Sequence, residues 1–216
     1  MVNYDLIRKM FELQDTFNEY TVKNWKNENL DWHRAIWLEC GEALDSTPWK
    51  WWKKGETDMA NLEVELVDIW HFIMSYLMTT NLDIKNNPQN YYDLFEGNFN
   101  RFEIKDLLED MASLSLERNY NFEIDKMLIP IFFCAWAEIG RNQEDLYKSY
   151  IIKNVLNKFR QDNGYKTGSY IKMWTKSAGI VVEDNVIAWE LSNDIDNLNN
   201  MFDELYIKLD KFYKNM

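Results

Sequence analysis

Two short segments carry carboxylates at a spacing that could hold a metal ion. The first reads E-C-G-E from Glu39 to Glu42, and the second reads E-L-V-D from Glu65 to Asp68. Residues three apart on a helix project from nearly the same face, so each segment places two carboxylates side by side. Four acids that face one another repel strongly unless a divalent cation neutralises them. The spacing therefore predicts a metal site built from these four acids.

The donor atoms limit the choice of metal. Oxygen ligands alone favour magnesium or manganese. A di-iron carboxylate site would need a second acid-x-x-histidine pair besides Asp68 and His71, but position 30, three before the other histidine, is a leucine. Zinc is disfavoured because the sequence has 2 histidines and 2 cysteines without paired spacing.

The expected chemistry is hydrolysis of a phosphoanhydride. The sequence has no glycine-rich phosphate-binding loop and no G-x-S-x-G motif. These absences argue against a P-loop nucleotide-binding site and against a serine hydrolase. Metal-assisted attack by water remains, with one carboxylate taking the proton of the water.

Polar residues elsewhere could bind the organic part of a substrate. Gln14 and Asn18 lie one turn apart on the first expected helix. Two interpretations stay open for them: a solvated flank beside the apolar stripe, or a pair of amides that read the edge of a nucleobase. The segment W-K-W-W-K-K from Trp49 to Lys54 is both aromatic and cationic. Its three tryptophans cannot all enter one core, so we expect at least one to wall a pocket or an interface.

A late helix and the glycine-containing loop after it carry a group of cations, amides and tyrosines, here called the cationic group. As a lone patch it would be a solvated helix end, whereas opposite a metal-carboxylate cluster it would clamp a polyphosphate. Its members are Lys153, Asn157, Arg160, Tyr165, Lys166 and Tyr170.

The composition predicts an all-α fold with one domain over residues 1–216. The chain is 46% hydrophobic and 16% aromatic, with only 7 glycines and 3 prolines. Helices are expected at 4–20, at 104–117, 124–139, 144–161 and 194–213, and after caps at Asp31 and Asp58. The first should bury Leu6, Met10, Leu13 and Phe17, and the second Ile36, Leu38 and Leu44. Residues 81–100 are expected to connect two helical halves.

The net charge and the distribution of apolar residues argue against several classes of protein. A formal net charge of -12 argues against binding a nucleic-acid backbone. No stretch approaches a membrane span, and the N-terminal residues lack the apolar core of a signal peptide. The cysteines, Cys40 and Cys134, are expected to be reduced core thiols of a cytoplasmic protein.

Four segments carry a family resemblance, and they occur in order along the chain. They are W-H-R-A-I-W-L-E-C-G-E-A-L-D-S (Trp32 to Ser46), W-K-W-W-K-K (Trp49 to Lys54), E-L-V-D-I-W-H-F (Glu65 to Phe72) and K-N-V-L-N-K-F-R-Q-D-N-G-Y-K-T-G-S-Y (Lys153 to Tyr170). The chain closely resembles the dimeric, all-α dUTPases of the MazG-like nucleotide pyrophosphohydrolase superfamily. The acid pairs resemble the superfamily as a whole, whereas the tryptophan-lysine segment and the last segment resemble its dUTPase branch.

The resemblance implies magnesium-dependent hydrolysis of dUTP and dUDP to dUMP by a homodimer with a rigid helical core and a mobile helical lobe. It implies that the four acids hold the metal and that Glu39 activates the water. Gln14 and Asn18 would face uracil beside Trp52, while the cationic group would contact sugar and phosphates. His71 and Phe72 would lie against the deoxyribose. The alternatives are a broader pyrophosphohydrolase acting on dCTP or damaged nucleotides, and a non-catalytic helical module that binds a nucleotide or a protein.

Overall fold

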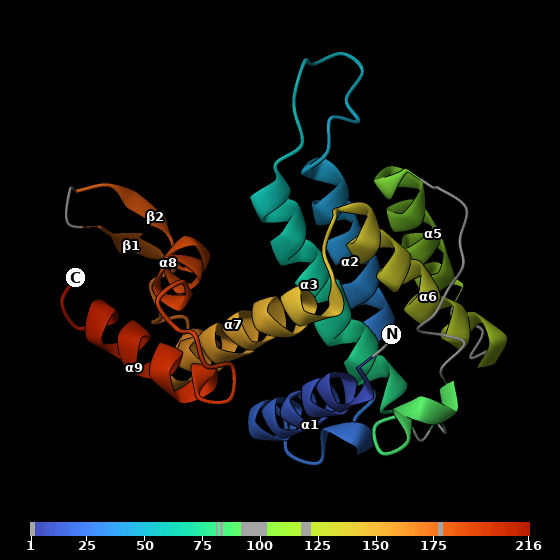
Figure 1. Cartoon of the computed structure of the whole chain (residues 1–216), viewed down its shortest axis with the longest axis horizontal. Coiled ribbons are helices and arrows are strands. Elements are labelled where there is room, and N and C mark those ends of the chain that lie inside the picture. Colours follow the sequence, from blue (N-terminus) through green and yellow to red (C-terminus); the bar gives the residue numbers. More distant parts are fainter. Residues whose placement is uncertain (1–2, 81, 83, 92–102, 118–121, 177–178) are drawn as a thin grey trace. The chain divides into compact units, whose positions relative to one another are not determined.

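The computed structural model describes residues 3–80, 82, 84–91, 103–117, 122–176 and 179–216 (Figure 1). The chain divides into two compact units, residues 1–147 and 148–216. Helices dominate both, and the part of the chain that the structure describes holds one two-stranded sheet, so the expected all-α class is confirmed. A single domain over residues 1–216 stays a prediction.

The first unit is built from helices around a central pair. Helix α2 packs against α3 and α5, α5 packs against α6, and α3 also contacts α1 and α6. The elements are α1 (Tyr4–Thr21), the 3-10 helix η1 (Trp25–Asn27), α2 (Trp32–Asp45), α3 (Met59–Leu77), the 3-10 helix η2 (Pro88–Tyr91), α5 (Ile104–Leu116), α6 (Phe122–Glu138) and the start of α7 (Gln143–Asp162).

Helix α3 is largely buried within this unit. Apolar residues at helical spacing form a stripe that is buried throughout, and they are Leu62, Leu66, Ile69, Ile73 and Leu77. Trp70 on the same helix stacks on Phe132 of α6 at a centroid distance of 4.8 Å and meets Phe11 of α1 edge-on at 6.0 Å. These contacts fix α3 between two other helices, so the acids that it carries have a rigid support.

Helices α2 and α3, which carry the four predicted metal ligands, begin differently. The carboxylate of Asp58 accepts a hydrogen bond from the backbone N–H of Asn61 at 3.1 Å and so caps α3 as expected. Asp31 occupies the corresponding position before α2, but its side chain makes no capping bond. It pairs instead with Arg34, at 2.5 Å.

The buried face of α2 differs from the expected one. Leu38 is 48% exposed, so its expected inward position is wrong. Ile36, Cys40 and Ala43 face the core instead, because their spacing of four and three residues keeps them on one side of a helix. Gly41 lies on an exposed position where an added Cβ would have nothing within 4 Å, so this glycine does not make room for a close neighbour.

The second unit combines the rest of α7 with a small hairpin and two helices. Its elements are the 3-10 helix η3 (Tyr165–Thr167), β1 (Met173–Thr175), β2 (Val181–Glu183), α8 (Asp184–Ser192) and α9 (Met201–Tyr213), with β1 and β2 antiparallel. Phe159 of α7 is fully buried in an aromatic core, with ring centroids 5.9 Å from Trp174, 5.5 Å from Tyr206 and 5.5 Å from Tyr213.

The last helix begins later than its sequence suggests. Residues 194–200 lie before α9, which starts at Met201, so the expected start at residue 194 is wrong. Asparagine and aspartate side chains compete with helical hydrogen bonding by bonding to nearby backbone groups. Asn197 does so here, because its side-chain oxygen accepts from the backbone N–H of Asn199 at 3.0 Å.

Two further expectations concern the connection between the helical halves and the absence of a membrane span. The connection expected at residues 81–100 falls largely outside the described residues. Among the helices that are described, none combines the length and the hydropathy needed to cross a bilayer.

Candidate active site

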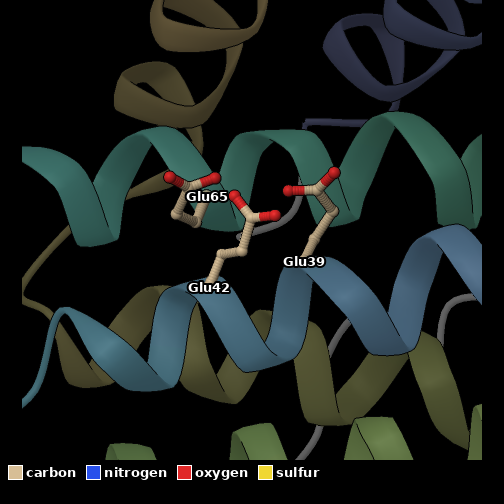
Figure 2. A group of neighbouring side chains, drawn as sticks. All are labelled: Glu39, Glu42 and Glu65. Carbon is tan, nitrogen blue, oxygen red and sulfur yellow. The ribbon is translucent and has the colours of Figure 1, made fainter.

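Helices α2 and α3 bring three of the four predicted metal ligands together. Glu39 and Glu42 come from α2 and Glu65 from α3, and one candidate ligand atom from each lies within 4.8 Å of the other two. Figure 2 shows the three carboxylates converging between the packed helices. Glu39 and Glu65 are half-buried, whereas Glu42 is exposed. The group offers only oxygen donors, and carboxylates partly withdrawn from water suit a hard divalent cation.

Asp68, the fourth predicted acid, does not belong to this close trio. It follows Glu65 by three residues on α3 and is half-buried. His71 comes one step further along and is buried, with Nδ1 at 2.7 Å from the backbone carbonyl of Val67. Phe72 packs against Trp32 of α2 at a centroid distance of 6.2 Å. The metal role of Asp68 and the deoxyribose contacts of His71 and Phe72 stay predictions.

A polar cavity of about 350 Å³ adjoins the trio and shares two of its acids. This volume lies within the range of small-molecule sites. The ends of α2 and α3 are tied together beside it, because the Ser46 backbone carbonyl accepts from the Asp58 N–H at 2.8 Å and the Ser46 hydroxyl accepts from the Asn61 amide at 2.8 Å. An anionic substrate could enter so acidic a cavity only with a cation. The lining residues are Glu42, Asp45, Ser46, Glu56, Asp58, Asn61 and Glu65.

The tryptophan-lysine segment forms the exposed loop between α2 and α3. Trp51 is 89% exposed and Trp52 is 59% exposed. The Trp52 ring meets Trp49 edge-on at 5.4 Å and Trp51 edge-on at 5.5 Å. These side chains therefore lie outside the core. That one of them walls a pocket or an interface, and that Trp52 lies beside the base, stay predictions.

The amides Gln14 and Asn18 form a hydrogen-bonded group inside the first unit. They are only 3% and 6% exposed, so the interpretation as a solvated flank is wrong. The Gln14 amide donates to Asn18 Oδ1 at 2.9 Å and to the Ser75 hydroxyl at 3.1 Å. The Asn18 amide donates to the same hydroxyl at 2.8 Å. A base can reach these amides only when neighbouring atoms move aside.

The buried face of α1 is consequently rotated from the expected stripe. Ile7, Met10 and Phe11 are fully buried along with the two amides, whereas Leu6 and Leu13 are half-buried. Burial of polar side chains costs free energy unless their hydrogen bonds are satisfied. Ser75 on α3 supplies those bonds, and this removes the main cost of turning the amide face inward.

In the second unit, the cationic group is held by a carboxylate. The guanidinium of Arg160 forms a bidentate pair with Asp184, with Nε to Oδ2 at 2.8 Å and NH2 to Oδ1 at 2.7 Å. Tyr170 donates its hydroxyl proton to Asp184 at 2.8 Å, and NH1 of Arg160 donates to Asn157 at 3.2 Å. Lys153 donates to Asn185 at 3.3 Å. Side-chain hydrogen bonds thus join four of the six predicted members through Asp184 and Asn185.

The other two members of the cationic group lie at the surface. Tyr165 and Lys166 are both exposed, on η3 directly after α7. Contact of the whole group with sugar and phosphates stays a prediction.

Two pKa shifts describe the protonation of groups beside these residues. Burial and the neighbouring charge of Glu39 raise the pKa of the Cys40 thiol to about 12, so this thiol is neutral at pH 7. Burial and the negative charge of Asp184 raise the pKa of Tyr170 above its ordinary value. The Tyr170 hydroxyl therefore remains a hydrogen-bond donor across the physiological range.

Three residues of these networks were not anticipated from the sequence. Ser75 looks like one polar residue in an apolar helix, and its partners lie 57 and 61 residues away. Asp184 and Asn185 stand at the start of α8, where short polar residues are common because they suit helix N-termini. The signal that could have found Asp184 is its burial beside Arg160 and Tyr170. Burial cannot be read from the sequence.

Comparison with known proteins gives the family. No curated protein matches the chain. A family model described as dUTPase matches residues 6–165, which is most of the chain and includes the three converging acids, Asp68, both amides and the first part of the cationic group. The described fold is helical, as in the all-α type of this family. The chain therefore belongs to the all-α dUTPase family, whose members are hydrolases acting on dUTP.

Proposed function

We propose that this protein hydrolyses dUTP, and also dUDP, to dUMP with magnesium or manganese as its cofactor. The observation that carries the proposal is the convergence of Glu39, Glu42 and Glu65 in a chain of the dUTPase family. The fit to such a cation rests on the donor set, which contains carboxylate oxygens from two helices. We add Asp68 to the ligand set because it matches the family's second acid pair.

The residues divide the chemistry between them. When bound, the cation would neutralise phosphate charge and lower the pKa of a coordinated water. Glu39 would accept the proton of the attacking water, and it stands within the carboxylate trio on a helix held by α3 and α5. A half-buried carboxylate has fewer competing waters around it than an exposed one, which favours Glu39 over Glu42 for this role.

The remaining assignments concern the substrate. Gln14 and Asn18 would contact uracil, Trp52 would lie beside the base, and His71 and Phe72 would adjoin the deoxyribose. The cationic group would bind sugar and phosphates. The pairing of Arg160 with Asp184 supports this last assignment, because a guanidinium already held in one orientation loses less side-chain entropy on binding an anion.

The direct test is release of phosphate or pyrophosphate from dUTP, dUDP, dCTP, dTTP and UTP, first with magnesium and then with a chelator. Metal-dependent turnover confined to dUTP and dUDP is the expected result. Turnover of dCTP at a similar rate would replace the proposal by a broader pyrophosphohydrolase, and turnover that survives complete metal removal would contradict the metal mechanism.

Substitution of Glu39 tests the proton transfer. Glu39→Gln keeps the shape of the side chain but removes its basicity, so we expect folding to be retained and turnover to fall by about 10²–10⁴-fold. Glu12→Gln on α1 is the matched control, because Glu12 is an exposed glutamate outside the trio. Undiminished hydrolysis by the Glu39→Gln variant would reject the assigned role.

We also propose a cytoplasmic homodimer. The resemblance to dimeric dUTPases supports the oligomeric state, and the two free cysteines, Cys40 and Cys134, support a reducing compartment. Sedimentation should give a mass twice the 26.1 kDa of one chain. A species of 26.1 kDa at micromolar concentration would contradict the dimer.

A further inference from the structure

The side-chain amide of Asn185, on α8, is held by two cations of the second unit. Its Oδ1 accepts from Nζ of Lys153 at 3.3 Å and from NH2 of Arg160, also at 3.3 Å. Ammonium and guanidinium groups have only donors, so the oxygen end of the amide is the only end that can face them. The NH₂ group of Asn185 is therefore turned away from both cations.

This NH₂ group has two N–H donors to offer. In the part of the chain that the structure describes, the side chain of Asn185 makes hydrogen bonds through Oδ1 alone. The side chain is half-buried, and its Nδ2 is not among the unpartnered polar atoms that are closed off from water. The oxygen atom of a ligand can therefore approach the NH₂ group from solvent.

The guanidinium of Arg160 holds a second amide in the same way. Its NH1 donates to Oδ1 of Asn157 at 3.2 Å, so the oxygen of this amide also faces the cation. Asp184 fixes the guanidinium that both amides share, because Nε and NH2 donate to its carboxylate at 2.8 Å and 2.7 Å. Asn157 belongs to the cationic group that we expect to contact the substrate, and Asn185 has the same relation to Arg160.

A phosphate oxygen is the acceptor that best suits the NH₂ group of Asn185. Hydrogen bonds to a charged acceptor are stronger than those between neutral groups. The two cations at the oxygen end of the amide also polarise it, which strengthens its N–H donors. A sugar hydroxyl or a base carbonyl can accept as well, but neither carries a full charge for the two cations to attract.

We propose that Asn185 is a further substrate-binding residue, whose NH₂ group donates to a phosphate oxygen of the nucleotide. The inference rests on the proposed function, because it takes the cationic group as the phosphate-binding part of the site. Asn185 has no charge of its own, so it contributes through a directed hydrogen bond. The residues that carry the inference, from Lys153 to Asn185, all belong to the second unit.

Asn185→Asp separates the roles of the two ends of the amide. An aspartate has nearly the same shape and still accepts from Lys153 and Arg160, so the hydrogen bonds inside the unit are kept. The outward NH₂ group, however, becomes a carboxylate oxygen that cannot donate and that repels a phosphate. A purely structural role would survive this substitution, whereas a phosphate contact would be lost.

The assay is calorimetric binding, with magnesium, of deoxyuridine and of a dUTP analogue that carries an imido group between its α and β phosphates and so resists hydrolysis. Asn185→Asp should weaken binding of the analogue by about tenfold to a hundredfold, the value of a hydrogen bond to a charged group. Asn185→Ala loses the donor without adding a charge, so it should weaken the analogue less. Deoxyuridine has no phosphate and should bind both variants as it binds the unsubstituted protein.

Asn199→Asp provides the matched control. Asn199 is an exposed residue of the same unit that lies before α9, and its substitution adds the same negative charge. Water and salt screen a charge at such a position. The affinity for the analogue should therefore stay close to that of the unsubstituted protein.

Three results would overturn the inference. One is an affinity for the analogue that Asn185→Asp leaves unchanged. Another is an equal loss of affinity for deoxyuridine and the analogue, which would indicate a structural role. The third is an equal loss in Asn199→Asp, which would indicate a general effect of charge. Absence of dUTP hydrolysis together with an Asn185-dependent affinity for the analogue would instead refute the hydrolytic function and leave the phosphate contact standing.

Discussion

Asp184→Leu removes a carboxylate that is wholly withdrawn from water and leaves the charge of Arg160 behind. The Asp184 side chain is 0% exposed and that of its partner is 10% exposed. Its two oxygens accept from Arg160 at 2.7 Å and 2.8 Å, and also from the Tyr170 hydroxyl. Loss of one partner from such a buried pair costs about 3–5 kcal/mol, mainly because the other charge stays buried without compensation.

An exposed ion pair of the same unit provides the comparison. Asp210 on α9 and Lys214, the C-cap residue directly after it, lie 2.7 Å apart, with side chains 38% and 69% exposed. Water screens this pair, and pairs spaced four residues apart on a helix contribute about 0.3–0.5 kcal/mol. Asp210→Leu should therefore lower the free energy of unfolding several-fold less than Asp184→Leu.

The assay is urea denaturation followed by circular dichroism, combined with hydrogen exchange of peptides from α8 and α9. The exchange measurement reports the local stability of the second unit directly. Asp184 also stands in the first turn of α8, where a negative charge suits the helix dipole. The double variant Arg160→Met with Asp184→Leu separates the cost of the uncompensated Arg160 charge from the loss of the Asp184 charge at the helix start. It removes the buried positive charge as well as its partner, so it should regain most of the lost stability. Equal losses for Asp184→Leu and Asp210→Leu, or a double variant no more stable than Asp184→Leu, would refute this reasoning.

Two further variants test the first unit. Burial by itself would raise the pKa of Asp15, but hydrogen bonds and positive charges from Lys26 and Lys85 outweigh it and hold that pKa below its ordinary value of 3.8. The resulting stabilisation is present above pH 3.8 and is lost as the pH falls through the folded-state pKa. The free energy of unfolding, measured as the pH is lowered, should therefore fall less steeply with pH for Asp15→Asn than for the unsubstituted protein. An identical slope for the two proteins would contradict the pairing. Gly41→Ala should raise the unfolding free energy by about 1 kcal/mol, because the site is helical and its Cβ would meet nothing within 4 Å; a lower thermal midpoint would contradict the open environment.

The helices of the first unit could be predicted because their signals are local. The expected span 4–20 agrees with α1 to one residue, and Asp58 caps α3 as its position suggested. The start of α9 was misplaced because residues 194–200 continue a helix-compatible pattern while Asn197 bonds to its own neighbourhood. The hairpin β1–β2 could not be anticipated from strands of three residues, which are too short for a repeating pattern.

The sequence by itself determined the helical class, the pairing of Glu39 with Glu42, the position of Glu65 on the next helix and the membership of the dUTPase family. These follow from spacings of a few residues, which α-helical geometry converts directly into shared faces. Only the tertiary structure decided that Gln14 and Asn18 point inward to Ser75 and that Arg160 is paired with Asp184. Such contacts join residues 24 to 61 positions apart, and which side chain meets a buried amide or cation is settled by how the helices pack and exclude water.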